Sequence, residues 1–116
     1  MKKAPERPLA ALLGRGAQFG GDLSFEGRVR VDGTFKGKIF TEDTLEIGEP
    51  GVIDGEIDAA VLIVSGLASG NIRARDRLVL EATGMLKGTV ETPSLEVHAG
   101  GRVDATVRVL PARELP

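Results

Sequence analysis

The chain has 116 residues and a net charge of −2, with 41% hydrophobic and 28% charged residues, which is the balance of one globular domain. It contains no cysteine, so disulfide frameworks and thiolate metal sites are excluded and a reducing, cytoplasmic setting is expected. Aromatic residues make up only 3% while glycine occurs 16 times, which fits a narrow aliphatic core with tight corners.

The first segment, residues 1–16, is expected to be a flexible basic tail. Residues 1–15 carry four basic side chains and one acidic side chain, so their charge is +3, whereas residues 16–110 carry −5. The apolar run from Leu9 to Leu13 is too short for a signal-peptide core or a transmembrane span. A solvated tail and a weak contact with an anionic membrane surface both remain open. The membrane-contact set would be Lys2, Lys3, Arg7, Leu9, Leu12 and Leu13.

From residue 17 to residue 110 one pattern recurs. A pair of apolar residues separated by one position returns five times, at steps of 16, 17, 16 and 17 residues. The pairs are Val29/Val31, Leu45/Ile47, Leu62/Val64, Leu78/Leu80 and Leu95/Val97. Each pair is followed by two apolar residues four positions apart that flank a small residue, and this small residue stands at positions 37, 55, 70, 88 and 105, with an earlier half-copy around position 21.

The period of about 17 residues is too short for a helical-pair repeat or a propeller blade. Apolar and polar residues alternate within each copy, which is the β period of two. Three short strands with corners fit in one period, so we expect an all-β, single-domain, three-sided β-helix of about five to six coils over 17–110. Stacked coils bury ladders of aliphatic side chains that one coil cannot bury alone. A β-sandwich is the alternative, but the regular period argues against it.

The two ends of this β-helix are the first candidate site. Nothing after Val109 is long enough to form a capping helix, and an uncapped coil offers unpaired backbone edges and open aliphatic side chains to another molecule. The alternative is that the tails fold back and cap a monomer. The polymer interface would comprise Phe19, Leu23 and Phe25 at the N-terminal end and Leu95, Val97, Val103, Val107 and Val109 at the C-terminal end.

Other residues carry weaker signals. Arg73, Arg75 and Arg77 alternate along one strand and are interpreted as a solvated or ion-paired face, because no aromatics are interleaved as nucleic-acid binding would require. His98, the single histidine, is expected to face outward. An acyltransferase of the left-handed β-helix type would need a hexapeptide repeat, and the steps of 15 to 18 residues between the small residues are not a regular multiple of six.

The Asp-Gly pairs at 32–33 and 54–55 are interpreted as turn residues, not calcium ligands. No nucleophile–base pair or carboxylate pair appears, so the chain is not expected to be an enzyme. We expect no catalytic, cofactor-binding or metal-binding residues, and nucleic acid is not an expected partner.

Four segments resemble the bactofilins, a family of bacterial cytoskeletal proteins: VDGTFKGKI (31–39), GVIDGEI (51–57), GMLKGTV (84–90) and GRVDATV (101–107). The last segment departs by having Ala105 where the others have glycine. The resemblance implies a right-handed β-helix with disordered flanks at 1–16 and 111–116. It also implies polymerisation without nucleotide, through like ends, into non-polar filaments.

The resemblance further implies attachment to the inner face of the cytoplasmic membrane through the N-terminal tail. The expected role is a scaffold for cell shape or for cell-wall-modifying enzymes. A monomeric β-helix module that presents one face to a protein partner is the alternative function.

Overall fold

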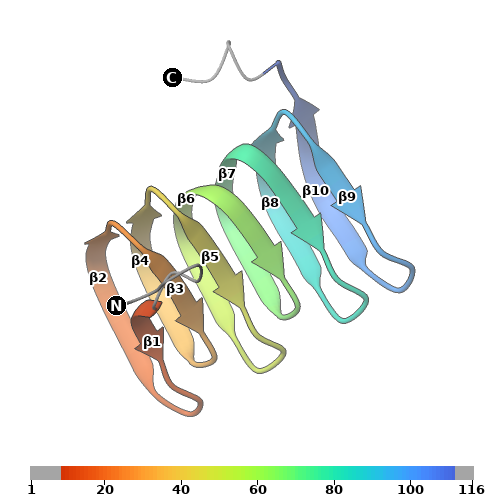
Figure 1. Ribbon diagram of the computed structural model, residues 1–116. Helices are drawn as coiled ribbons and strands as arrows, with labels where there is room; N and C mark the ends of the chain where they lie inside the picture. The colour runs from red at the N-terminus through yellow and green to blue at the C-terminus, as the bar shows by residue number, and fades with distance from the viewer. Residues whose placement is uncertain (1–8, 112–116) are drawn as a thin grey trace, which may run out of the picture.

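The computed structural model describes residues 9–111, which form one continuous stack of parallel β-strands (Figure 1). No helix occurs within this range. The strands are Leu9–Leu13 (β1), Gln18–Phe25 (β2), Arg28–Val31 (β3), Thr34–Thr41 (β4), Thr44–Ile47 (β5), Val52–Val64 (β6), Leu67–Leu80 (β7), Met85–Thr92 (β8), Leu95–Val97 (β9) and Arg102–Val109 (β10).

Each coil pairs in register with the coil that follows it in the chain. The Cα atom of Phe35 lies opposite Ile53, and that of Ile53 lies opposite Ala68. The same register stacks Leu45 on Leu62 and Leu62 on Leu78. The result is a solenoid of about six turns, which confirms the all-β, three-sided β-helix expected from the period.

The recurring glycine allows the coils to approach each other at one corner. Gly37 and Gly55 are opposite each other in register, and both have positive φ, at 132° and 146°. A Cβ atom on Gly55 would lie 1.9 Å from the carbonyl oxygen of Gly37. These values show that neighbouring coils approach each other closely at this corner. Ala105 lies opposite Gly88, which has positive φ. No described residue other than glycine has positive φ, so the last coil has a different backbone conformation at this corner.

The core is a set of aliphatic ladders with two threonines. Thr41 and Thr92 are fully buried in the ladder that also contains Phe25, Ala59 and Ala74. The Thr92 hydroxyl donates to the carbonyl of Ser94 at 3.0 Å, and Thr41 likewise donates to a backbone carbonyl. The two hydroxyls are therefore satisfied, which is the condition for burying them without loss of stability.

The N-terminal boundary expected after residue 16 is wrong, because the solenoid begins earlier. Residues 9–13 form β1 and pair with β3, with the Cα of Leu13 opposite Val31. The side chain of Leu13 is only 7% exposed. Ala11 and Leu13 repeat the apolar pair Val29/Val31 of the next coil, but alanine is a weak apolar signal. The C-terminal strand β10 ends at Val109, and residues 112–116 lie outside the described residues.

Candidate functional site at the two open ends

The C-terminal end of the solenoid exposes a layer of valines that is covered elsewhere in the stack. Val97 continues the ladder of Leu80, and Val103 continues that of Leu86. Leu80 and Leu86 are fully buried, whereas Val97 and Val103 are 46% and 40% exposed, and Val109 is 59% exposed. Leu95 and Val107 pack against the core from the same layer. The five predicted C-terminal residues thus lie in one open layer.

The N-terminal end is similar but holds larger side chains. Phe19 stacks on Phe35 and is 38% exposed, while Leu23 and Phe25 are half-buried against the core. Sequence analysis missed Ala11 and Leu13 as further members of this layer. Their alternation, in step with the next coil, was the signal that could have identified them.

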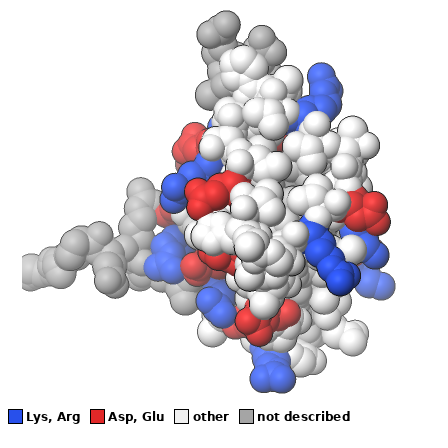
Figure 2. Space-filling view, turned by 90° about the vertical axis from the view of Figure 1, so that its right-hand side faces the viewer, with Lys and Arg blue, Asp and Glu red and all other residues white. Residues whose placement is uncertain are grey.

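The strands at both ends also have one free edge each within the described residues. β1 pairs with β3 and β2 pairs with β4 at one end, while β9 pairs with β7 and β10 pairs with β8 at the other. The outer N–H and C=O groups of these strands are a template for another chain. Figure 2 faces the side of the molecule that carries β9 and β10, and uncharged atoms form a broad area there with charged groups at its sides. The alternative that the tails cap these ends concerns residues 1–8 and 112–116, which lie outside the described residues.

The predicted membrane-contact residues separate into three groups. Lys2, Lys3 and Arg7 lie outside the described residues. Leu12 points away from the core and is 57% exposed. Leu13 is a core residue, so its assignment as a membrane contact is wrong, and the backbone of Leu9 is paired in β1. No helix within residues 9–111 is long and apolar enough to cross a bilayer.

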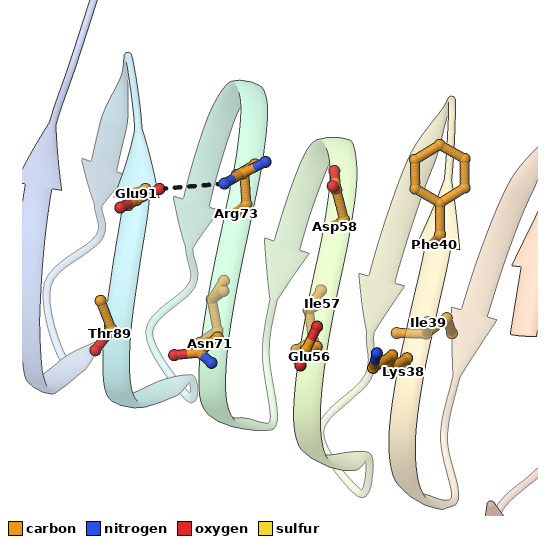
Figure 3. A pocket seen from close by; sticks show the side chains of 11 residues that line it. Lys38, Ile39, Phe40, Glu56, Ile57, Asp58, Asn71, Arg73, Thr89 and Glu91 are labelled. Carbon is orange, nitrogen blue, oxygen red and sulfur yellow. Dashed lines mark ion pairs between the residues drawn. The ribbon is translucent and has the colours of Figure 1, made fainter. Parts of the chain in front are cut away.

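Two residues of the arginine run, Arg73 and Arg75, form ion pairs, and Figure 3 shows the pair of Arg73 with Glu91 on a side face. Arg73 lies 3.6 Å from Glu91, measured from Nη2 to Oε1. Arg75 lies 3.1 Å from Asp58, measured from Nε to Oδ1, and its guanidinium stands over the ring of Phe40. These contacts confirm the ion-paired interpretation for Arg73 and Arg75. A shallow groove of about 470 Å³ runs over this face.

His98 follows β9 and faces outward, as expected. Its Nε2 lies 2.6 Å from a carboxylate oxygen of Glu96, and its Nδ1 lies 3.4 Å from one of Glu81. On another face the carboxylate of Asp32 accepts a 3.0 Å hydrogen bond from Arg30, which raises the pKa of Arg30 above its usual value. The described residues contain no group of three or more His, Asp or Glu side chains arranged to hold a metal ion.

The family model for bactofilins, described as polymer-forming cytoskeletal, matches residues 11–108. The chain belongs to the bactofilin family. It is similar to the protein Bactofilin BacO of Myxococcus xanthus, with 26% identity over 101 residues that cover 84% of this chain and 80% of that one.

Two solved bactofilin structures from Thermus thermophilus are similar to this chain. One is a cryo-EM reconstruction of double helical filaments, with a TM-score of 0.75, 28% identity and coverage of 84% of this chain and 99% of that chain. The other is the crystal structure of a phenylalanine-to-arginine mutant, with a TM-score of 0.70, 30% identity and coverage of 76% and 98%. As a bactofilin, the chain is a structural, polymer-forming cytoskeletal protein.

Proposed function

We propose that this chain polymerises end to end through its two open layers, without nucleotide, into non-polar filaments. The observation that supports the proposal is that apolar ladders buried throughout the stack remain half-exposed at both ends. The residues that would form the joints are Phe19, Leu23 and Phe25 at one end and Leu95, Val97, Val103, Val107 and Val109 at the other.

Burial of the C-terminal layer gives a substantial driving force. Val97, Val103 and Val109 are on average about half exposed. Full burial of a valine contributes roughly 1.5–3 kcal/mol, so covering these three recovers roughly 2–5 kcal/mol. Pairing of the free strand edges adds to this, which is needed because association itself costs at least about 4 kcal/mol.

Joints between like ends are supported by the backbone at Ala105. Each interior coil stacks at this corner through a glycine with positive φ, and the last coil departs from that conformation. The outer surface of the last coil therefore differs from the surface on which an ordinary next coil sits. A twofold joint between identical ends needs only self-complementarity and does not require the repeat to continue.

Arginine substitutions at each end distinguish like-end joints from head-to-tail joints. We expect Val97→Arg to stop at dimers joined through the N-terminal ends and Phe19→Arg to stop at dimers joined through the C-terminal ends, while the double variant stays monomeric. A head-to-tail polymer would give monomers from either single variant. Asn71→Arg, on an exposed side position, is the control and should form normal filaments. Analytical ultracentrifugation reads the size, and long filaments from both single variants would overturn the proposal.

We further propose that the filament lies on the inner face of the cytoplasmic membrane and acts as a scaffold for cell-shape or cell-wall machinery. Support for the membrane part is the basic sequence with Lys2, Lys3 and Arg7, which precedes the exposed Leu12 in the chain. Each such contact is weak, at about 1 kcal/mol per basic residue near anionic lipid, but many copies along a filament act together.

A further inference from the structure

One side of the solenoid carries outward residues whose order is self-complementary. We call five consecutive segments of this side the lateral face, which consists of the outward positions of 34–36, 52–54, 67–69, 85–87 and 102–104. The first coil adds only the uncharged Gln18 and Gly20 beyond it. The middle residue of each segment points into the core, so the two outer residues form two parallel rows along the solenoid axis.

The first row of the lateral face is apolar in its centre. Thr34, Val52, Leu67, Met85 and Arg102 follow one another in register. Val52, Leu67 and Met85 are all partly exposed, although they point away from the core.

The second row is charged, and its charges have no partners within the described residues. Lys36, Asp54, Ser69, Lys87 and Asp104 follow one another in register. All four charged residues are exposed, and none forms an ion pair with a described residue.

The other two sides carry ion pairs as well as exposed single charges. Arg73 and Arg108 both pair with Glu91 on the face drawn in Figure 3, and Arg28 pairs with Glu46 on the third side. On the lateral face all four charges of the second row are left for an external partner.

When one copy of the face is reversed along the solenoid axis, each charge of the second row meets an opposite charge of the other copy. The apolar residues of the first row then meet one another. Along the solenoid the second row runs positive, negative, neutral, positive, negative. A twofold axis that lies between the two faces, parallel to the strands and level with segment 67–69, places Lys36 opposite Asp104 and Lys87 opposite Asp54. The same axis places Leu67 on its own copy and Val52 on Met85. A twofold interface requires this kind of self-complementarity.

We propose that the lateral face pairs with the same face of a second copy in antiparallel orientation and joins two filament strands side by side. Each copy contributes two lysines and two aspartates, which makes four Lys–Asp pairs. These pairs run alongside an apolar strip centred on the two Leu67 side chains. A twofold axis parallel to the solenoid axis would instead place the first row of each copy opposite the second row of the other, and the Lys–Asp pairs would be lost.

The size of the lateral face indicates when this pairing occurs. Five coils at about 4.8 Å by three residues at about 3.3 Å give a flat patch of roughly 24 by 10 Å. That is well below the roughly 800 Å² per partner of a stable complex between free proteins. Pairing therefore needs many subunits held in a row. The inference rests in this way on the end-to-end assembly proposed above.

Charge reversal with rescue tests the pairing. Lys36→Glu with Lys87→Glu makes the whole row acidic, and negative-stain microscopy should show only single strands. Adding Asp54→Lys and Asp104→Lys restores the complement with reversed signs, so side-by-side strands should return. The matched control is Lys38→Glu with Arg77→Glu, which has the same charge change at exposed positions on the other sides and should leave paired strands intact.

A single cysteine tests the position of the twofold axis, because the chain has no cysteine of its own. Ser69→Cys should give disulfide-linked dimers when paired filaments are oxidised, and Asn71→Cys, two residues further on the adjacent side, should not. Single strands from the wild-type chain, or paired strands from the acidic variant with no Ser69→Cys cross-link, would overturn the lateral pairing. The absence of any filament from the wild-type chain would instead overturn the end-to-end proposal.

Discussion

A Cβ atom added to the glycine corner should destabilise the fold through two separable effects. In Gly55→Ala the residue keeps φ near 146° and its Cβ lies 1.9 Å from the Gly37 oxygen. The conformation costs about 1–2 kcal/mol for a residue other than glycine. A normal contact between this Cβ and the Gly37 oxygen is roughly 3.3 Å, so the two coils must move apart by more than ~1 Å. Two weakened hydrogen bonds add about 1–3 kcal/mol, so we expect a total loss of about 2–5 kcal/mol.

Three other glycines separate the two effects. Gly14 has neither positive φ nor a neighbour within 4 Å of an added Cβ, so Gly14→Ala should change stability by less than about 0.5 kcal/mol. Gly16 has φ of 82° in open space, and Gly16→Ala should cost only the conformational part, about 1–2 kcal/mol. Gly66 lacks positive φ, but its added Cβ would lie 2.3 Å from a backbone oxygen, so Gly66→Ala isolates the overlap.

The measurement is urea unfolding followed by circular dichroism, with all variants in the monomeric background that carries both Phe19→Arg and Val97→Arg. Blocking both ends keeps the assembly state constant, because polymerisation would otherwise raise the apparent stability. The order of stability should be Gly14→Ala, then Gly16→Ala, then Gly55→Ala. Equal midpoints for Gly14→Ala and Gly55→Ala would refute the argument that the corner needs glycine.

Three further predictions concern the core, a side face and the N-terminus. Leu80→Asp buries an unpaired carboxylate in a fully enclosed ladder position and should abolish the β signal in circular dichroism; a folded variant of normal melting temperature would contradict the inward register. Arg75→Ala loses the pair with Asp58 and the ring contact and should cost about 1–2 kcal/mol, whereas Arg77→Ala, with an exposed side chain, should be neutral; equal midpoints in urea would speak against the pairing. Deletion of residues 1–8 removes most of the basic segment and leaves β1 intact, so filaments should persist while co-sedimentation with anionic liposomes falls; undiminished sedimentation would exclude this segment as the contact.

The period along the chain was enough to predict the architecture. The inward register follows directly from residues such as Leu45, Leu62 and Leu78, which are apolar at one step of the repeat and stack in the structure. The five C-terminal end residues were also predictable, because an inward position in a last coil has no following coil to cover it. The structure places all of them in the open layer.

The first coil was harder to recognise, for a physical reason. Ala11 fills a position that a larger aliphatic residue fills in later coils, so the alternation of apolar and polar residues in 9–13 is weak. The nearby lysines and arginines favour the interpretation of this region as a tail. The charge order of the lateral face is also not apparent from the sequence alone. It becomes visible only when the register aligns residues 36, 54, 69, 87 and 104, which are separated by 15 to 18 positions in the chain.

Because each coil pairs only with its neighbours, the number of coils fixes the length of the subunit along the solenoid axis. About six turns at roughly 4.8 Å give a subunit length of roughly 29 Å along the axis. In the like-end joint proposed above, the first coils of two subunits meet, one pair for every two subunits, at intervals of roughly 58 Å. Insertion or removal of one coil in the middle would change this interval by roughly 10 Å and leave both end layers as they are. Coil number thus sets the spacing of whatever the filament carries, independently of how the filament is joined.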